Sequence, residues 1–328
     1  MLVTGPNGAG KTNLLEALHV GTQGFSPRAR SDAQLIRVGA EAGRVRLAGA
    51  VEERRFESDV VLSSREARRA SLNGEVLRSA EQLRLELQTL VFTPDRLAVV
   101  KGGPATRRAY LDRSLGRLFP AKAALPVEYA AAVGQRNAAL RRLGAGVSSR
   151  EAVAPWTETV AALGEALVVA RRNAIDLLAS PFAACADRLG LASATLVYEG
   201  EPVSVADLEE RFAKDLERGV TGAGPHLHDV GVRAAGRELR AFGSQGEQRM
   251  AVLALVLGEA EALSERASSR PLVLLDDVLS ELDDGRRRAL GGMIGGSGQT
   301  VVTTTSASAL PSEPSQLLAV SPGEVRAA

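Results

Sequence analysis

The segment from Gly5 to Thr12, with the sequence GPNGAGKT, constrains this chain more than any other feature. It fits the P-loop pattern at every required position, with an apolar pair before it and a helix-like run after it. Glycines let the backbone N–H groups turn inward toward phosphate oxygens, and the start of the following helix adds a favourable dipole. A glycine-rich turn that binds nothing is the alternative, but chance matches to the full pattern are rare.

The P-loop pattern also indicates a role for individual residues. We expect Lys11 to reach the β and γ phosphates of a nucleotide and Thr12 to hold Mg²⁺. The predicted nucleotide-binding residues of this segment are Gly5, Pro6, Asn7, Gly8, Ala9, Gly10, Lys11 and Thr12.

An apolar strand that ends in paired carboxylates supplies the second half of such a site. Residues 271–275 are followed directly by Asp276 and Asp277. We expect Asp276 to hold Mg²⁺ and Asp277 to orient or deprotonate the attacking water. A buried strand leading into an acidic turn would explain this segment taken alone, but its occurrence beside a P-loop favours a nucleotide site. A further strand ends in the hydroxyl side chains of residues 303–305.

A third segment, residues 244–248 (SQGEQ), introduces an apolar helix. A serine with a glycine at the start of a helix offers an anion site, although ordinary N-capping explains the same residues. Its place just before the acidic-ended strand favours a role at the nucleotide.

The charge balance limits how this protein could hold a charged partner. Its 40 basic and 39 acidic residues give a net charge of +1, so any nucleic acid must be held by local patches. The single cysteine, Cys185, excludes an internal disulfide. The longest apolar run, residues 250–257, is far shorter than the roughly 20 residues that span a bilayer. We therefore expect a cytoplasmic protein.

The pattern of elements predicts an α/β fold in which a P-loop head carries an antiparallel β layer and an inserted helical lobe. Broken alternation over residues 45–77, with a turn at Asn73-Gly74, indicates the antiparallel layer. Apolar spacings of three and four indicate helices in the lobe. The expected domains are an N-terminal head part (1–104), a mainly helical lobe (105–221) and a C-terminal head part (222–328).

The first strand is short for a P-loop head. Only four residues precede Gly5, whereas a buried strand usually has about five or six. We expect an N-terminus that is truncated relative to related proteins, with Leu2–Thr4 left at an exposed sheet edge.

Together these segments resemble the heads of ABC-type ATPases. Two further stretches, residues 94–112 and 275–283, resemble signatures of the RecF family of bacterial recombination and repair proteins, and residues 135–141 also look familial. The resemblance runs from residue 1 to about residue 305. It implies a homodimer joined head to tail over two ATP molecules, in which Ser244, Gly246 and Gln248 of one subunit contact the nucleotide of the other.

The same resemblance implies a function in DNA metabolism. Members of the family bind DNA, and with RecO and RecR they help load recombinase on gapped DNA and assist replication and the SOS response. We accordingly expect single-stranded and gapped duplex DNA as partners, and a slow ATPase that DNA stimulates.

Some residues depart from the pattern of ABC-type ATPases. The hydroxyl residues 303–305 occupy the position at which many of these enzymes carry a histidine. Gln88, which lies close to Thr93-Pro94, is a candidate for their Q-loop glutamine. His226 and His228 are expected on a strand face without a metal. Because Asp277 is shorter than the usual glutamate, a nucleotide-switched DNA clamp with negligible turnover stays open. The inserted lobe argues against a transporter ATPase.

The arginines of the helical lobe are the candidates for DNA contact. Arg113 and Arg117 share one helical face, whereas the adjacent Arg107 and Arg108 diverge by about 100°. That adjacent pair suits packing, with an ion pair to Asp112 four positions after Arg108. The predicted phosphate contacts are Arg113, Arg117, Arg136 and Arg141, with solvated helix faces as the alternative.

Overall fold

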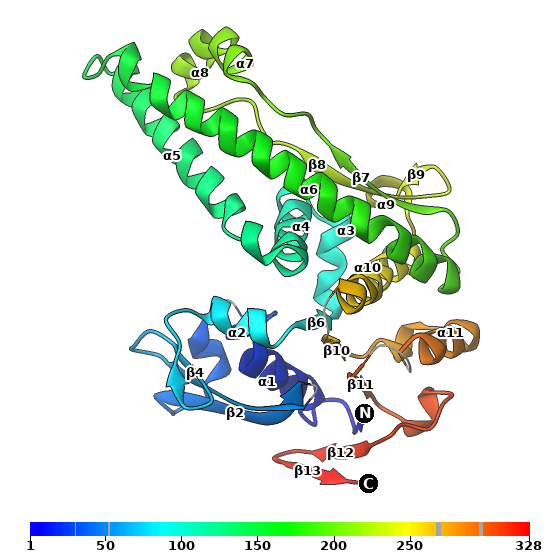
Figure 1. Cartoon of the computed structure of the whole chain (residues 1–328). Helices are drawn as coiled ribbons and strands as arrows, with labels where there is room; N and C mark the ends of the chain where they lie inside the picture. Colours follow the sequence, from blue (N-terminus) through cyan, green and yellow to red (C-terminus); the bar gives the residue numbers. More distant parts are fainter. Residues whose placement is uncertain (30, 52, 267–269, 295–297) are drawn as a thin grey trace. The chain divides into compact units, whose positions relative to one another are not determined.

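A computed structural model describes residues 1–29, 31–51, 53–266, 270–294 and 298–328 (Figure 1). Its contacts divide the chain into two units. The first contains Met1–Leu97, Ala184–Leu191 and Val252–Ala328, and the second contains Ala98–Ala183 and Ala192–Ala251. This division differs from the predicted boundaries, because the segment around Ser244 groups with the helical lobe.

The first unit is built on a six-stranded sheet with the order β13-β12-β1-β11-β10-β6. The strands are β1 (Leu2–Thr4), β6 (Thr89–Phe92), β10 (Leu272–Leu275), β11 (Thr300–Thr304), β12 (Leu317–Ser321) and β13 (Glu324–Ala327). All neighbours are parallel except β12 and β13. The expectation of an exposed edge at β1 is wrong, since β11 and β12 pair with it on either side.

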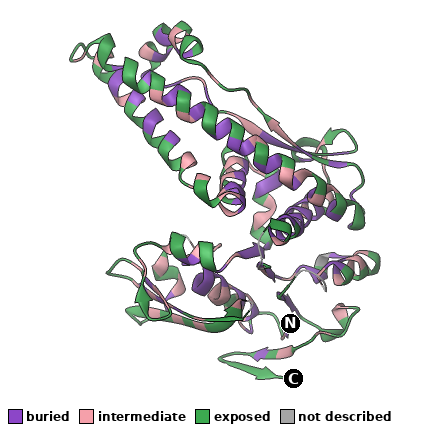
Figure 2. Ribbon diagram, viewed as in Figure 1, coloured by how far each residue is buried: buried purple, intermediate pink, exposed green. Residues whose placement is uncertain are grey.

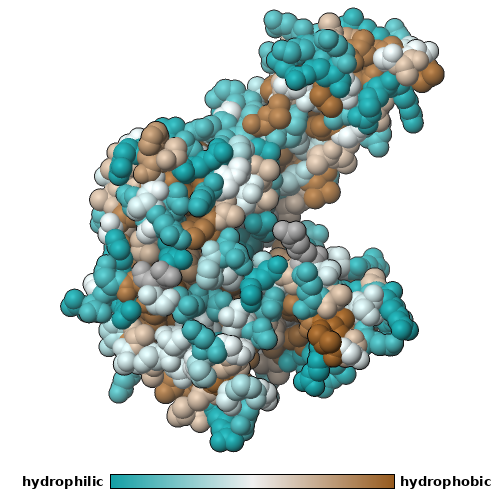
Figure 3. All heavy atoms as spheres, turned by 180° about the vertical axis from the view of Figure 1, so that it is seen from behind, coloured by the Kyte–Doolittle hydropathy of each residue, from teal (hydrophilic) through white to brown (hydrophobic). Residues whose placement is uncertain are grey.

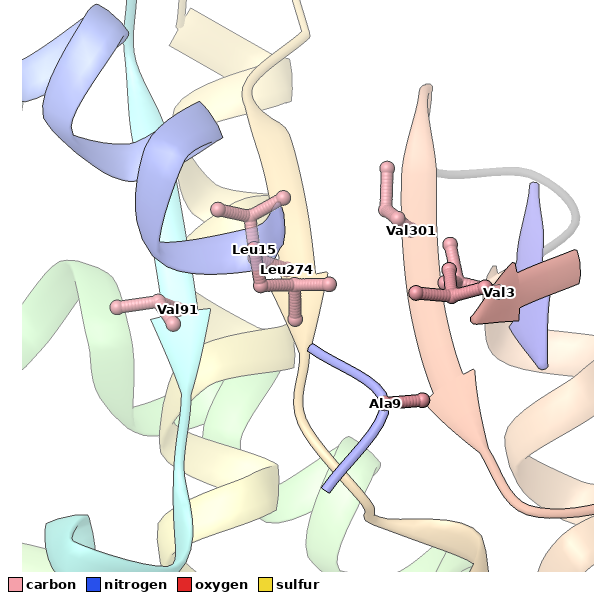
Figure 4. Packing of buried hydrophobic residues seen from close by; sticks show 7 residues of the cluster. Val3, Ala9, Leu15, Val91, Leu274 and Val301 are labelled. Carbon is pink, nitrogen blue, oxygen red and sulfur yellow. The ribbon is translucent and has the colours of Figure 1, made fainter. Parts of the chain in front are cut away.

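Helix α1 (Lys11–Gln23) supplies part of the core of this sheet. Its Leu15 joins Val91 of β6, Leu274 of β10 and Val301 of β11 in one buried cluster (Figure 4). Side chains alternate along a strand, so residues two positions further along each strand also point to the α1 side. These positions lie at the carboxyl ends of the strands, where sites in parallel sheets form.

The predicted antiparallel layer is present as a second sheet. It contains β2 (Ala42–Val51), β3 (Arg54–Ser63), β4 (Arg69–Leu72) and β5 (Glu75–Val76). The turn between β4 and β5 is made by Asn73 and Gly74 at φ 53° and 85°, the left-handed pair that a tight hairpin requires. One face of this sheet is buried against helix α2 (Ala80–Glu86), with Val60 and Leu83 fully buried.

The second unit is mainly helical, as predicted, with a small sheet that the sequence did not reveal. Its helices include α3 (Ala98–Lys101), α4 (Pro104–Leu118), α5 (Leu125–Gly144), α7 (Val205–Glu210), α8 (Phe212–Arg218) and α9 (Leu239–Phe242). The sheet has the strands β7 (Ala194–Glu199), β8 (Asp229–Ala234) and β9 (Arg237–Glu238). Helices α7 and α8 follow one another closely and are separated at Arg211.

Three further helices, α6 (Ala154–Arg188), α10 (Gln245–Arg266) and α11 (Asp284–Ile294), complete the fold. Helices α6 and α10 begin in the second unit and end in the first. Helix α11 follows β10 in the first unit. The 3-10 turns are η1 (Asp32–Leu35), η2 (Pro94–Leu97), η3 (Pro120–Lys122), η4 (Arg150–Ala152), η5 (Leu279–Glu281) and η6 (Ala307–Ala309).

The helix within residues 150–188 is long and apolar enough to cross a membrane by length and composition alone, and it is the one such helix in the described part of the chain. The core helix of a soluble protein can meet the same test, so one such helix is weak evidence for a membrane span. Buried and exposed residues alternate along α6 in Figure 2, as in an amphipathic helix. On the face drawn in Figure 3, hydrophilic and hydrophobic residues are interspersed.

Candidate nucleotide and magnesium site

The P-loop adopts a backbone that glycine makes possible. Gly8 and Gly10 have φ of 78° and 104°, and α1 begins directly after Gly10. A Cβ atom on Gly5 would lie 2.3 Å from the carbonyl oxygen of Val320 on β12, so the loop passes this strand too closely for a larger residue. The Lys11 ammonium lies over the loop and donates to the carbonyl oxygens of Gly5 and Pro6 at 2.7 and 3.0 Å.

Asp276 lies at the carboxyl end of β10, beside the start of α1. Its Oδ1 accepts a hydrogen bond from Thr12 Oγ1 at 3.1 Å and another from Thr303 Oγ1 at 2.8 Å. The Asp276 side chain is buried, with 5% exposure. Residues that are 264 positions apart in the chain thus place a hydroxyl and a carboxylate together. Oxygen ligands of this kind suit Mg²⁺, so Thr12 and Asp276 fit the predicted metal site.

The second carboxylate, Asp277, stands in a strained backbone conformation. Its φ of 48° lies in the left-handed region, which costs a non-glycine residue free energy and is found at functional sites. Its N–H donates to Thr303 Oγ1 at 2.9 Å. Its buried Oδ1 has no hydrogen-bond partner among the described residues. One oxygen of Asp277 is therefore available for a further contact, and the catalytic role of this residue stays a prediction.

Thr303 is a site residue whose role the sequence did not reveal. One hydroxyl donates to Asp276 and accepts from the backbone of Asp277. The run of hydroxyl residues at the end of β11 was visible in the sequence. Its position indicated a place at the site but did not indicate which groups Thr303 contacts.

The segment at Ser244 begins α10 with the reciprocal bonds of a capping box. Ser244 Oγ accepts from the N–H of Glu247 at 3.2 Å, and Glu247 Oε2 accepts from the N–H of Ser244 at 2.7 Å. The bond from the Ser244 backbone lowers the pKa of Glu247 below its ordinary value. Ser244 and Gly246 are exposed, as contact with a second subunit requires. The Ser-x-x-Glu spacing in the sequence could have indicated that Glu247 completes this capping box.

Gln248 does not face outward with these residues. It is buried with 6% exposure, and its Nε2 donates to the carbonyl oxygen of Leu239 at 2.9 Å. The prediction that Gln248 contacts a partner's nucleotide is therefore wrong, because its amide ties α9 to α10.

The prediction that Arg136 contacts DNA is also wrong. Its side chain has 0% exposure and makes an ion pair with Asp215 at 2.8 Å. Arg136 also donates to the hydroxyls of Thr157 and Thr221 at 3.1 and 3.0 Å. It occupies the buried stripe of α5, at a spacing of three from Val133. This helical spacing from an apolar residue could have indicated from the sequence that Arg136 is buried.

The other predicted arginines differ in exposure. Arg141 is exposed at the end of α5 and donates to the carbonyl oxygen of Gly219 at 3.3 Å. On α4, Arg113 is exposed and Arg117 is half-buried. DNA contact by these three residues stays a prediction.

The expected pair between Arg108 and Asp112 does not form. Asp112 instead accepts two hydrogen bonds from Arg171 of α6 at 2.8 and 2.9 Å. Arg108 donates to the carbonyl oxygen of His228 at 2.6 Å, and Arg107 pairs with Asp229 at 2.7 and 2.5 Å. Both arginines therefore join α4 to the start of β8 and its preceding loop.

The two histidines of this region have aromatic partners. The hydroxyl of Tyr129 lies 2.7 Å from His226 Nδ1, and that of Tyr198 lies 2.9 Å from His228 Nδ1. Burial lowers the pKa of both histidines. The described residues contain no group of three or more acidic, histidine or cysteine side chains that could together hold a metal.

Gln88 lies at the wrong end of β6 for a contact with the nucleotide. Its carbonyl oxygen accepts from the N–H of Leu272, at the amino ends of β6 and β10. Asp276 lies at the carboxyl end, where Thr93 follows β6. Gln88 is thus not the Q-loop residue.

Comparisons with known proteins show the family of this chain. The family model of the RecF/RecN/SMC N-terminal domain matches residues 1–325. The DNA replication and repair protein RecF of Myxococcus xanthus is 37% identical over 326 residues, covering 93% of this chain and 84% of the relative. The chain belongs to the RecF family. RecF of Anaeromyxobacter dehalogenans strain 2CP-C is 38% identical, covering 93% and 86%.

Solved structures support the same membership. The recombination mediator protein RecF with ATP, from the RecFOR pathway, matches with a TM-score of 0.87 and 26% identity, covering 100% of this chain and 91% of the other. An Smc head domain of Pyrococcus furiosus matches with a TM-score of 0.58 and 16% identity, which shows a shared fold. The predicted α/β fold of an ABC-type ATPase head is confirmed, and so is the resemblance to the RecF family.

Proposed function

We propose that this RecF family protein is an ATP-dependent DNA-binding protein of recombinational repair. ATP and Mg²⁺ bind at the P-loop, and two copies join head to tail over two nucleotides on single-stranded or gapped duplex DNA. The names of the relatives, DNA replication and repair proteins, support this assignment. So does the RecF structure that carries ATP.

One observation carries the nucleotide part of the proposal. Asp276 Oδ1 accepts hydrogen bonds from both Thr12 and Thr303, which joins the P-loop helix to the ends of two parallel strands. In a nucleotide site, a buried carboxylate and a P-loop hydroxyl that lie side by side can hold the same cation. Mg²⁺, when bound, neutralises charge on the β and γ phosphates.

The protein's own residues divide the remaining work. Lys11 exchanges its bonds to the loop carbonyls for bonds to phosphate oxygens. Asp277 holds the attacking water through its unpartnered oxygen and takes up a proton from it. Thr303 fixes the direction of the Asp276 carboxylate and holds the backbone of Asp277.

The dimer rests on the exposed start of α10. Ser244 and Gly246 there present backbone and hydroxyl groups at the positive end of a helix dipole, which suits the γ-phosphate in a second subunit. Arg141, Arg113 and Arg117 are the candidates for DNA phosphates.

Membership of the RecF family supports an assignment to a place in the cell. We assign the protein to the cytoplasm, where it works with RecO and RecR to load recombinase on gapped DNA and assists replication and the SOS response. A RecF structure described as part of the RecFOR pathway supports this partnership.

A second candidate function is a nucleotide-switched DNA clamp with negligible turnover. It is favoured by Asp277, which is shorter than glutamate and is held at φ 48° by its bond to Thr303. The two candidate functions thus share one site. They differ in whether Asp277 lies close enough to the attacking water to take its proton.

ATP binding, ATP hydrolysis and light scattering, each with and without single-stranded and gapped duplex DNA, test the proposal. We expect ATP-dependent dimers and a slow hydrolysis rate that DNA raises. Dimers without hydrolysis would favour the clamp. A protein that binds neither ATP nor DNA would contradict both functions.

A further inference from the structure

Thr93 is a buried residue with an unused hydroxyl. It follows β6 directly and has 3% exposure. Its Oγ1 is buried and has no hydrogen-bond partner within the described ranges. Its carbonyl oxygen accepts from the N–H of Arg96 at 2.9 Å, so the backbone here is held in place. A buried hydroxyl without a partner costs free energy and calls for an explanation.

The strand register places Thr93 level with Asp276. Strands β6 and β10 are parallel with Phe92 opposite Leu275, and the N–H of Asp276 donates to the carbonyl oxygen of Phe92 at 2.9 Å. Val91 and Leu274, two residues earlier, both belong to the core cluster on the α1 side (Figure 4). Because side chains alternate, Thr93 and Asp276 point to that same side.

Strand β11, which pairs with the other edge of β10, also places a threonine beside Asp276. Thr303 lies two residues after Val301 of the same cluster, and β11 pairs with β10 so that Val302 is opposite Leu275. Asp276 is thus flanked by one threonine from each neighbouring strand. The Thr303 hydroxyl is bonded to it at 2.8 Å.

We propose that Thr93 is a positioning residue of the nucleotide site, whose hydroxyl holds a water molecule of the Mg²⁺ shell beside Asp276. The inference rests on the proposed ATP site. A threonine on the adjacent strand is about 4.8 Å away at the backbone, a separation that a bridging water can span. A hydroxyl can also accept from such a water while remaining neutral.

Removing the hydroxyl tests this. Thr93→Val and Thr93→Ala should raise the Mg²⁺ concentration needed for half-maximal ATP binding roughly tenfold, the scale of lost outer contacts to a metal. Thr93→Ser keeps the hydroxyl and should restore the wild-type value. Calorimetric titration of ATP at a series of Mg²⁺ concentrations measures the shift.

Thr300→Val is the matched control. Thr300 Oγ1 is likewise buried without a partner among the described residues, but it lies at the amino end of β11, away from Asp276. Its removal should leave the Mg²⁺ requirement unchanged.

Thermal unfolding without nucleotide separates positioning from packing. If the Thr93 hydroxyl serves only the water, Thr93→Val should unfold at the wild-type midpoint or above it, because an unsatisfied polar group is lost. A midpoint lowered in Thr93→Val and restored in Thr93→Ser would assign the hydroxyl to packing and overturn the proposal.

The Mg²⁺ titration can also contradict the inference directly. An unchanged Mg²⁺ requirement in Thr93→Val, with normal ATP binding by the wild-type protein, would overturn it and leave the proposed function intact. If Thr93→Val does not fold, Thr93→Ala carries the same comparison. A wild-type protein that does not bind ATP would overturn the proposed function and this inference together.

Discussion

The hydroxyl of Thr303 donates to Asp276 Oδ1 at 2.8 Å and also accepts the N–H of Asp277 at 2.9 Å. One side chain at the end of β11 thus contacts the carboxylate of Asp276 and the backbone of Asp277, the two acids that follow β10. Because the two acids have different backbone conformations, with Asp277 at φ 48°, they present their oxygens in different directions. In the proposed function, Asp276 would hold the metal and Asp277 the attacking water.

Replacing Lys11 tests nucleotide binding. We expect Lys11→Ala to weaken ATP binding by 100-fold or more, since hydrogen bonds to a charged group contribute about 1.5–3 kcal/mol each. Calorimetry with ATP and Mg²⁺ measures this. The control is Lys214→Ala, at an exposed lysine of α8, which should bind as the wild type does. Equal affinity in the two variants would refute the assignment of Lys11.

Asp277→Asn separates binding from hydrolysis. The amide keeps the shape of the side chain but cannot take a proton from water, so ATP should bind and persist, and ATP-bridged dimers should accumulate. Light scattering and phosphate release together measure the outcome. Asp284→Asn, at an exposed acid of α11, is the control. Wild-type hydrolysis by Asp277→Asn would assign the chemistry to another group.

Two substitutions of Ser244 separate its cap from its contact. Ser244→Ala removes the capping hydroxyl, which costs about 0.5–2 kcal/mol of stability. Ser244→Arg adds bulk and charge where a second subunit's phosphate is expected to dock, and should also abolish ATP-dependent dimers. ATP binding by the monomer should persist in both. Dimers of Ser244→Arg in light scattering would contradict the head-to-tail arrangement.

Arg136 and Arg141 should respond in opposite ways to the same change. Arg136→Gln leaves Asp215 buried and without its ion pair, which should cost about 3–5 kcal/mol of unfolding free energy. Arg141→Gln should change stability by less than about 0.5 kcal/mol, because the side chain is exposed. If Arg141 contacts a duplex phosphate, its loss lowers the slope of log affinity against log salt by about 0.9. Urea unfolding and salt-dependent DNA binding measure the two effects.

His226 should make stability depend on pH. Its Nε2 lies 3.0 Å from the carbonyl oxygen of Thr221, so Nε2 carries the proton and Nδ1 accepts from Tyr129. Burial lowers its pKa below the usual 6.5, so the unfolded state binds more protons in this range. Unfolding free energy should therefore fall as pH drops below about 6.5. In His226→Gln that fall between pH 7.5 and 5.5 should be smaller, and an equal fall would exclude His226 as the cause.

The P-loop and the acidic strand were predictable because their requirements are local. Gly8 and Gly10 are needed by the backbone at their own positions, and the two acids directly follow an apolar strand. The antiparallel layer was predictable for the same reason, since alternation and the Asn73-Gly74 turn lie within one short stretch.

Features that depend on distant partners were not predictable in this way. Strand β7 pairs with β8, which follows two intervening helices, and its own alternation is weak. Asp112 has a potential partner four residues away in Arg108, yet it pairs with Arg171 on another helix. A sequence shows which charges are available, while packing determines which of them meet.

The pairing of β1 has a consequence for how the protein is made. Met1 donates to the carbonyl oxygen of Thr300, 299 residues later, and β1 has no partner strand in the sheet other than β11 and β12 among the described residues. At about 5–20 residues per second, a ribosome needs roughly 15–60 s to supply those partners after the P-loop emerges. The strand that leads into the phosphate-binding loop therefore lacks both of its neighbours until residues 300–321 have been synthesised, so this part of the sheet cannot complete its folding before then.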